Sequence, residues 1–327
     1  MVVNELRTRL NENTVVTIGG NDYAIGKILS DSGASCLVYN AMRLPTEFER
    51  SIGMPCIPAV VKEFYPVAIS ENIKRDNGSD DLIIASNKQS KFDVLFQEFI
   101  RGAIEQVKFY GKGSIHSLAP SRIGGANSTF YTVVDSAAGE SLDKAVMESN
   151  KRLSLHEIVQ VIASLTEAVK ELHDKQILHL DIKPSNIFLF ENNGILSQRV
   201  ALFDFDTVLH IEEAQAGNCK IGFSAGWSAP EQGSASIPPR HNEISKATDV
   251  FAIGAVLYWA VTGNRVTDDV LSQIKLNEFD FLNDIHDIGA RNAVKEYLKL
   301  TLMRVPADRA TLTEGSQTNK WMKHKDC

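Results

Sequence analysis

The segment His179–Leu189, with the sequence HLDIKPSNIFL, restricts what this chain can fold into more than any other part of it. It brings Asp181, Lys183 and Asn186 close together around the rigid Pro184. In this spacing the carboxylate can orient a hydroxyl group and accept its proton, the ammonium group can balance phosphate charge, and the amide oxygen can bind a metal ion. A polar loop that caps a helix is the alternative interpretation of the same residues.

The part of the chain before this segment is dominated by strand patterns. Runs of β-branched and aromatic residues broken by turn signals predict an antiparallel meander over Thr14–Met42, and further strands over Ala59–Tyr65 and Phe130–Val134. Aromatic residues at helical spacing over Phe92–Ile100 predict one helix. The polar stretch from about 67 to 90 is expected to be an insertion, either a partner site or, by default, a solvated loop.

The second part of the chain is predicted to be mainly helical. It begins after a small-residue stretch at Asp135–Leu142 that is suited to a hinge. Ser154 can cap a long amphipathic helix, and two further helices are expected. Their ranges are Thr248–Thr262 and Arg291–Met303, and two short strand-like runs lie at Ile187–Phe190 and Val200–Phe205.

Composition narrows the class of protein. With 327 residues the chain exceeds what one hydrophobic core usually organises, so two lobes are expected. The net charge of −7 argues against nucleic acid or an anionic membrane as a partner. The longest apolar run, Val250–Val261, has 12 residues, too few for a membrane span, and the N-terminal residues lack a secretory signal, so we expect a cytoplasmic protein. Four widely spaced cysteines indicate neither a zinc site nor a disulfide framework.

The segment around Asp181 resembles the catalytic loop of protein kinases, whose pattern is HRDLKPxN. Two other motifs of that family occur in the expected order, one before this segment and one after it. Ala59–Lys62 resembles the VAIK strand, whose lysine pairs the ATP phosphates with a helix glutamate; Glu98 is the first candidate for that glutamate and Glu105 the alternative. Val200–Asp206 resembles the strand and DFG turn, which makes Asp204 a magnesium ligand.

Three later motifs favour a protein kinase over a small-molecule phosphotransferase. Ser228–Glu231 resembles the APE motif that closes the activation segment. Thr248–Gly254 resembles the buried helix that anchors the catalytic loop through its aspartate. Pro306–Arg309 resembles the late segment whose arginine pairs with the APE glutamate.

Three positions depart from the family pattern. Only Gly33 clearly remains of the glycine-rich loop that covers the phosphates. Leu180 replaces the arginine that receives an activation-loop phosphate, which predicts that activity does not require that phosphate. Asp206 replaces the glycine of DFG; it indicates a locked active geometry or tighter metal binding, or alternatively an exposed turn aspartate.

The resemblance implies an α+β, bilobal protein kinase fold. A small antiparallel β-lobe with one key helix is expected over 23–138, with the insertion at about 67–90, after an N-terminal extension over 1–22. A larger, mainly helical lobe is expected over 139–327, with ATP between the lobes. The implied ATP-binding residues, besides Lys62 and Glu98, are Gly33, Val38, Val60, the gatekeeper Val134, the backbone of Asp135 and Ala137, and Phe188 on the pocket floor.

The implied function is ATP-dependent protein serine/threonine kinase. Asp181 positions the acceptor hydroxyl, Lys183 steadies the γ-phosphate and Lys62 orients ATP, while Asn186 and Asp204 bind Mg²⁺. The lysine in DIKPSN is of the serine/threonine-specific type, so the partner is a protein substrate with a Ser or Thr acceptor, and a regulatory protein partner is possible. The alternatives are a pseudokinase that signals by binding nucleotide or partners, and a metabolite kinase.

Overall fold

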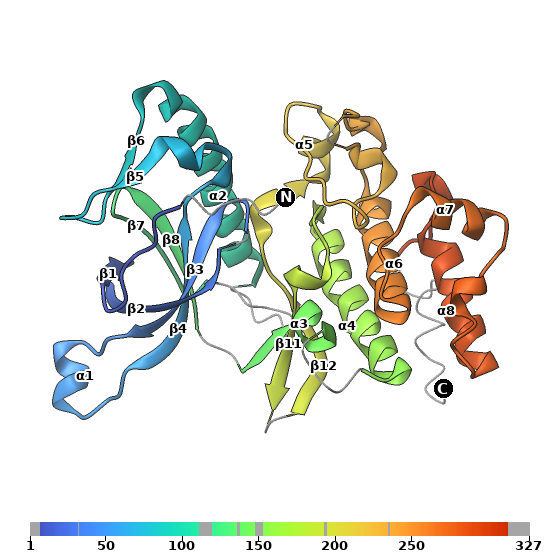
Figure 1. Cartoon of the computed structure of the whole chain (residues 1–327), viewed down its shortest axis with the longest axis horizontal. Coiled ribbons are helices and arrows are strands. Elements are labelled where there is room, and N and C mark those ends of the chain that lie inside the picture. Colours follow the sequence, from blue (N-terminus) through green and yellow to red (C-terminus); the bar gives the residue numbers. More distant parts are fainter. Residues whose placement is uncertain are drawn as a thin grey trace. The chain divides into compact units, whose positions relative to one another are not determined.

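The computed structural model of the chain describes residues 7–31, 33–110, 120–135, 138–147, 153–192, 195–234 and 236–312. The chain forms two compact units (Figure 1). The first unit comprises Met1–Ser114 and Leu118–Ala137, and the second comprises Ile115–Ser117 and Ala138–Cys327.

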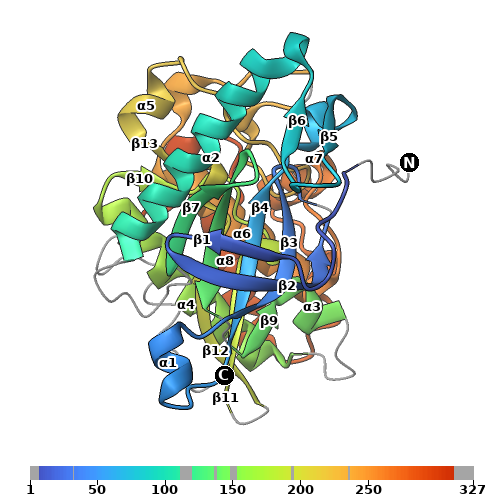
Figure 2. The same cartoon turned by 90° about the vertical axis from the view of Figure 1, so that its left-hand side faces the viewer.

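The first unit contains a six-stranded antiparallel sheet in the order β1-β2-β3-β4-β8-β7 (Figure 2). The strands are β1 (Val15–Ile18), β2 (Asn21–Ser30), β3 (Cys36–Arg43), β4 (Ile57–Phe64), β7 (Arg122–Ala126) and β8 (Thr129–Asp135). Gly19 and Gly20, both with positive φ, form the two-residue turn between β1 and β2, a conformation that glycine adopts without strain. The predicted antiparallel meander is therefore confirmed, and it includes residues before Tyr23 that the sequence analysis set apart as an extension.

Helix α2 (Gln89–Tyr110) packs on the sheet through its aromatic residues. The rings of Phe92, Phe96 and Phe99 lie with their centroids 5.4, 5.7 and 5.1 Å from that of Phe64 at the end of β4. The helix expected from the aromatic spacing is confirmed. A short helix, α1 (Glu47–Ser51), lies between β3 and β4 and begins at a capping box formed by Thr46 and Glu49.

The stretch from 67 to 90 is not the solvated loop that its polar composition predicted. It forms the hairpin of β5 (Ile73–Arg75) and β6 (Leu82–Ile84), flanked by 3₁₀ turns at Val67–Asn72 and Ser86–Lys88. Ile69, Ile73 and Leu82 are buried in the core of the unit. Apolar side chains at these few positions anchor the segment, although polar residues surround them in the sequence.

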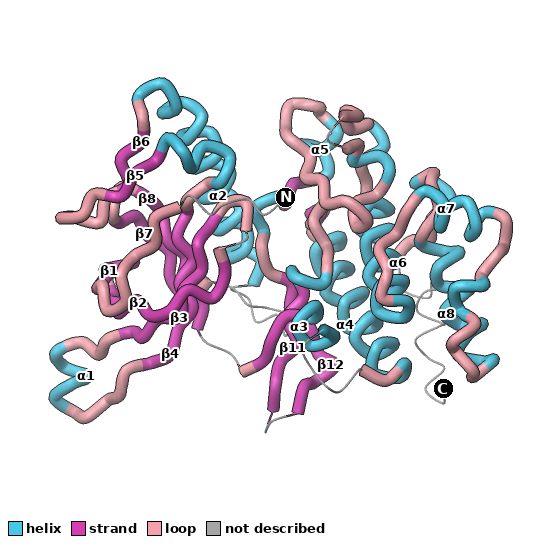
Figure 3. The backbone as a smooth tube through the Cα atoms, viewed as in Figure 1, coloured by secondary structure: helices cyan, strands magenta, loops and turns pink. Residues whose placement is uncertain are grey.

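The second unit is mostly helical, as Figure 3 shows. Its helices are α3 (Leu142–Met147), α4 (Leu155–Asp174), α5 (Ile211–Gln215), α6 (Lys246–Thr262), α7 (Asp268–Lys275) and α8 (Ile288–Thr301). Its strands are β9 (Gly139–Ser141), β11 (Ile187–Asn192) and β12 (Ile195–Leu202) in one sheet, and β10 (Ile177–Leu178) with β13 (Leu209–His210) in another. Its described residues also form 3₁₀ turns at Pro184–Asn186, Phe205–Thr207, Pro230–Gln232, His241–Glu243, Asp280–Leu282 and Pro306–Asp308.

The long helices of this unit follow the sequence prediction. Ser154 caps α4 in a capping box with Glu157. Helix α6 contacts both α4 and α8 and is buried from Thr248 to Trp259, as its uninterrupted apolar sequence predicts. None of the helices in the described ranges is long and apolar enough to cross a membrane.

A fully buried ion pair joins Arg309, near the C-terminal end of the second unit, to Glu231 in the middle of that unit. Arg309 donates from Nη1 to Oε1 of Glu231 at 2.6 Å and from Nη2 to Oε2 at 2.9 Å. Thr248 at the start of α6 donates to the same carboxylate at 2.8 Å. The pairing expected between the APE glutamate and the late arginine is confirmed.

We expect Arg309→Met to lower the free energy of unfolding by about 3–5 kcal/mol, because Glu231 then stays buried without its counter-charge. Urea unfolding followed by circular dichroism measures the change, and adding Glu231→Gln should restore part of the stability. The control is Arg304→Ala, which removes an ion pair with Asp268 whose side chains are 45% and 84% exposed. Its expected cost is less than about 1 kcal/mol, and equal losses in both variants would contradict the prediction.

Candidate functional site

The three residues singled out in the loop after β10 lie together in the structure. Lys183 Nζ is 2.7 Å from Asp181 Oδ2. Asn186 Nδ2 donates to the backbone oxygen of Asp181 at 2.9 Å and to its Oδ2 at 3.1 Å. Pro184 begins the 3₁₀ turn that carries Asn186 back toward Asp181, and β11 starts directly afterwards. The spacing in the sequence therefore brings a carboxylate, an ammonium group and an amide together. We call these three residues the Asp181 cluster.

Ser224 completes this cluster and was missed by the sequence analysis. Its hydroxyl donates to Asp181 Oδ1 at 2.7 Å and accepts from Lys183 Nζ at 3.3 Å. The only signal in the sequence is its position seven residues before Glu231, ahead of the motif that resembles the close of the activation segment. The contact shows that the Asp181 carboxylate can accept a hydrogen bond from an aliphatic hydroxyl.

Asp249, in the first turn of α6, holds the backbone of this loop. Its carboxylate accepts the N–H groups of His179 and Leu180, each at 2.9 Å, and lies 3.0 Å from His173 Nε2. Leu180 adopts a left-handed conformation with φ of 63° at this point. Burial acts to raise the pKa of Asp249, but the hydrogen bonds from His173, His179 and Leu180 outweigh it and lower the pKa, so the carboxylate is ionised. The anchoring aspartate expected from the sequence is confirmed.

The segment after β12 lies against the same loop. Asp204 has a left-handed conformation with φ of 67°, and the next residue, Phe205, is buried with its ring 5.2 Å from that of His179. The N–H of Phe203 donates to the backbone oxygen of Asn186 at 3.2 Å. Burial lowers the pKa of His179, although the nearby carboxylates of Asp249, Asp181 and Asp204 act to raise it. The residues on either side of Asp204 therefore contact the loop that carries Asp181 and Asn186.

Two departures from the family pattern have a structural explanation. Asp206 lies in the 3₁₀ turn Phe205–Thr207 and is not among the residues with positive φ, so no glycine is needed there. Leu180 is buried in an apolar cluster that contains residues of the segment before Glu231. We call this the Leu180 cluster; it consists of Leu178, Leu180, Leu209, Ala214, Ile221 and Ile244.

In the first unit, four predicted ATP-binding residues share one face of the sheet. Val38 is opposite Lys62 in the β3–β4 register, and Val60 is opposite Val134 in the β4–β8 register. Because Val60 and Lys62 are two residues apart on β4, all four side chains project from the same face. All four are half-buried.

The other predicted positions are placed as follows. Gly33, in the loop between β2 and β3, has no positive φ, and an added Cβ would meet only Cys36 O, at 3.5 Å. The backbone of Asp135 is paired with Ala59, and Ala137 lies outside the described residues. Phe188 is half-buried on β11 in the second unit.

Helix α2 carries both glutamates considered as partners of Lys62. Glu98 is half-buried, and Glu105 forms an ion pair with Lys108 at 2.8 Å. The pairing of Lys62 with either glutamate stays a prediction.

A pocket of about 370 Å³ lies beside the Asp181 cluster in the second unit. Lys183 and Ser224 form part of its wall, Trp227 and Trp259 supply apolar surface, and Asp143 and Arg265 supply opposite charges. One carboxylate oxygen of Asp143 is buried without a hydrogen-bond partner among the described residues. The pocket therefore presents both apolar surface and charged side chains next to the residues that contact Asp181.

Comparison with known proteins identifies the family. The model of the protein kinase domain matches residues 115–322, well over half of the chain, so the chain belongs to the protein kinase family. Among its relatives is the serine/threonine-protein kinase PknA of Mycobacterium tuberculosis, 28% identical over 156 residues. That match covers 47% of this chain and 33% of PknA, so the chain spans only about a third of that relative.

Solved structures share the fold at low sequence identity. A structure described as "PpkA-294 apo form" superposes with a TM-score of 0.71 at 19% identity, covering 96% of this chain and 99% of the other. A double mutant of the PknI kinase domain of Mycobacterium tuberculosis gives a TM-score of 0.58 at 17% identity, covering 96% and 97%. The chain therefore has the α+β, bilobal protein kinase fold that the sequence predicted.

We expect Asp249→Asn to release the loop that carries Asp181. The amide side chain has one acceptor in place of two, so the N–H groups of His179 and Leu180 should exchange faster, and the free energy of unfolding should fall by about 2–3 kcal/mol. Hydrogen exchange followed by NMR measures the first effect and urea unfolding the second. Asp268→Asn, at an exposed acid in the first turn of α7, is the matched control. Unchanged exchange at His179 and Leu180 would rule out this anchoring role.

Proposed function

We propose that the chain is an active protein serine/threonine kinase that uses ATP and Mg²⁺. The observation that carries the proposal is the cluster in which Asp181 contacts Lys183, Asn186 and the hydroxyl of Ser224. Membership of the protein kinase family supports it. Each residue with a direct chemical role in such a reaction has the required side chain.

Asp181 is the residue we assign to the acceptor hydroxyl. Its carboxylate would accept the proton of the attacking Ser or Thr hydroxyl as the oxygen forms its bond to the γ-phosphorus and the bond from that phosphorus to the leaving ADP oxygen breaks. The 2.7 Å contact from Ser224 shows that a hydroxyl fits against this carboxylate. Lys183, 2.7 Å from Asp181, would balance the charge of the transferred phosphoryl group.

The donor set of the second unit fits a magnesium ion. The Asn186 side chain uses Nδ2 for its two hydrogen bonds to Asp181, which leaves its amide oxygen as the atom for a cation. The described ranges contain no group of three or more His, Cys, Asp and Glu side chains that could hold a metal, and Mg²⁺ usually needs only one or two protein ligands when phosphates supply the others. Asn186 and Asp204 would therefore hold Mg²⁺, whose charge offsets that of the phosphates.

In the first unit, the face of the sheet with Val38, Val60, Lys62 and Val134 is the surface we assign to ATP. Three aliphatic side chains suit the adenine ring, and the ammonium group of Lys62 suits the phosphates. The acceptor is expected to be Ser or Thr, because Lys183 in the segment DIKPSN is the lysine typical of serine/threonine-specific kinases. The name of the relative PknA agrees with this acceptor class.

Asp181→Asn is expected to lower Mg²⁺-dependent transfer of labelled phosphate from ATP to protein by at least about 10²-fold, because the amide cannot accept the proton. Asp174→Asn, an exposed acid at the end of α4, is the matched control and should keep full activity. Transfer that survives in Asp181→Asn would overturn the assignment. A folded wild-type protein that transfers no phosphate would indicate a pseudokinase, and transfer to a small alcohol alone would indicate a metabolite kinase.

Activity is expected to survive complete dephosphorylation. The Leu180 cluster joins the catalytic loop to the segment before Glu231 by apolar contacts, and Gln232 Nε2 donates to the backbone oxygens of Leu180 and Gly222 at 2.8 and 2.9 Å. Phosphatase-treated protein, verified by mass spectrometry, should retain at least about half of its kcat. Loss of nearly all turnover, regained on phosphorylation of this segment, would contradict this role for the Leu180 cluster.

A further inference from the structure

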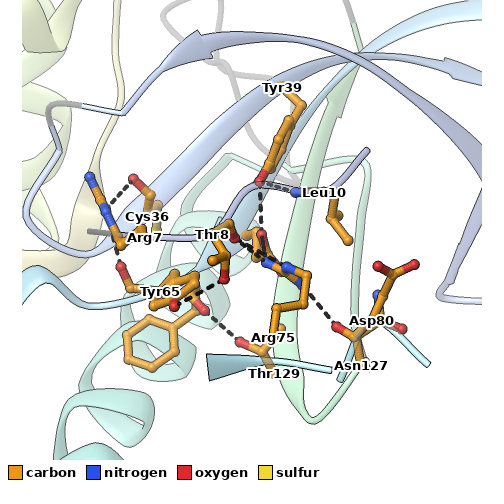
Figure 4. A network of polar contacts seen from close by, with 12 residues as sticks. Arg7, Thr8, Leu10, Cys36, Tyr39, Tyr65, Arg75, Asp80, Asn127 and Thr129 are labelled. Atoms are coloured by element: carbon orange, nitrogen blue, oxygen red, sulfur yellow. Dashed lines mark hydrogen bonds and ion pairs between the residues drawn. The ribbon is translucent and has the colours of Figure 1, made fainter. Parts of the chain in front are cut away.

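The residues before β1 are part of the first unit and reach the loop between β2 and β3. The side chain of Arg7 is buried, with only 4% of the residue exposed. Its Nη1 donates to the backbone oxygens of Gly33 and Cys36 at 3.0 Å and of Tyr65 at 3.1 Å, and its Nη2 donates to that of Asp31. Figure 4 shows Arg7 beside Cys36 and Tyr65. One guanidinium group thus binds both ends of the loop and the residue that follows β4.

The backbone oxygens of four successive loop residues all accept hydrogen bonds. Arg7 uses those of Gly33 and Cys36, while the N–H of Val67 donates to Ala34 O at 2.9 Å and the N–H of Tyr65 donates to Ser35 O at 2.8 Å. The loop is therefore fixed through its carbonyl groups to the end of β4 and to Arg7. Such attachment limits the freedom of a loop at the position where the kinase family has a flexible, glycine-rich one.

The segment that carries Arg7 is itself firmly held. Arg75 of β5 donates to the backbone oxygen of Thr8 from Nε at 3.1 Å and from Nη2 at 3.0 Å. The N–H of Leu10 donates to the hydroxyl of Tyr39 at 3.2 Å (Figure 4). Arg75 and Tyr39, which make these contacts, both donate hydrogen bonds to the buried carboxylate of Glu63. Arg7 is thus connected through Thr8 and Leu10 to a rigid part of the sheet.

We propose that Arg7 is a positioning residue of the ATP site: it holds the loop residues 33–36 in the conformation that binds the phosphates. This proposal rests on the proposed function, since it gives the loop a nucleotide to bind. The planar guanidinium supplies several donors in a fixed geometry, which a lysine ammonium group cannot match. Loss of Arg7 leaves the carbonyl groups of Gly33 and Cys36 without this donor, so the loop becomes mobile although the strands on either side remain paired.

The test compares Arg7→Ala and Arg7→Lys with Arg43→Ala in the full-length chain. Arg43 lies at the opposite end of β3 and pairs with Glu49, so it is an arginine of the same unit without contact to the loop. Hydrogen–deuterium exchange without nucleotide reads out the loop directly, because the N–H groups of Tyr65 and Val67 donate to it. Steady-state kinetics then give KM for ATP and kcat separately.

We expect the Tyr65 and Val67 amides to exchange about tenfold faster in Arg7→Ala, since a factor of ten corresponds to about 1.4 kcal/mol, close to one hydrogen bond. In the same variant, KM for ATP should rise about tenfold, whereas kcat should stay within about twofold of the wild-type value. This pattern is expected when a mutation removes a contact that contributes to substrate binding. Arg7→Lys should lie between Arg7→Ala and the wild type, and it replaces Arg7→Ala if that variant does not fold. Arg43→Ala should match the wild type in both measurements.

The outcomes separate this proposal from the proposed function. Unchanged exchange at Tyr65 and Val67 in a folded Arg7 variant overturns the proposal, as does faster exchange spread evenly over the whole first unit. Local loosening with an unchanged KM for ATP also overturns it. If the wild type transfers no phosphate, the proposed function fails on its own; ATP affinity measured by calorimetry then replaces KM, and an affinity equal in the wild type and Arg7→Lys overturns the role of Arg7.

Discussion

The candidate site of the second unit depends on the hydrogen bonds that the carboxylate of Asp249 accepts. By accepting two successive backbone N–H groups it stabilises the left-handed conformation of Leu180, and the next residue along the chain is Asp181. Thr207 donates to the backbone oxygen of His179 at 2.9 Å, so the turn that carries Asp204 is positioned against the same loop. The loop that this buried acid holds thus carries Asp181 directly and contacts the turn that follows Asp204.

Glu63 has a comparable role in the first unit. It is fully buried on β4, and Arg75, Tyr39 and Tyr131 all bind its carboxylate. Burial is the largest influence on its pKa and raises it, whereas Arg75 and the tyrosine hydroxyl groups act in the opposite direction. A buried carboxylate needs such partners, and this requirement gives the β5–β6 hairpin and the segment around Thr8 fixed positions. Because side chains alternate along β4, this network lies on the face opposite Lys62.

The sequence predicted those features whose signal is local. Strand alternation, the aromatic spacing of α2 and the cap at Ser154 each lie within one element, and the spacing of Asp181, Lys183 and Asn186 lies within one loop. The contacts that the sequence did not reveal join distant residues of ordinary appearance. Ser224 is 43 residues from Asp181, and Arg7 is 26 residues from Gly33. A serine in a small-residue segment and an arginine near a terminus have no pattern that distinguishes them from surface residues, because their partners are backbone or side-chain groups defined only by the fold.

The error over residues 67–90 has the same physical origin. Composition measures the average polarity of a segment, whereas its order depends on whether a few side chains reach the core. Ile69, Ile73 and Leu82 do so, and Arg75 meets a buried counter-charge, so the surrounding polar residues stay at the surface of an ordered hairpin.

Each of the three departures from the family pattern has a local structural basis, and two of them share one physical feature. At the arginine position, apolar packing around Leu180 connects the segments that a charge would otherwise join. In the glycine-poor loop, hydrogen bonds to four carbonyl groups provide the fixed geometry, and flexibility is lost. At Asp206, a right-handed turn removes the need for glycine. At the first two positions, contacts that are already formed in the folded protein stand where the family pattern has a device that depends on charge or on flexibility. Such contacts are weakly sensitive to salt, since apolar packing and buried hydrogen bonds are screened far less than exposed charges.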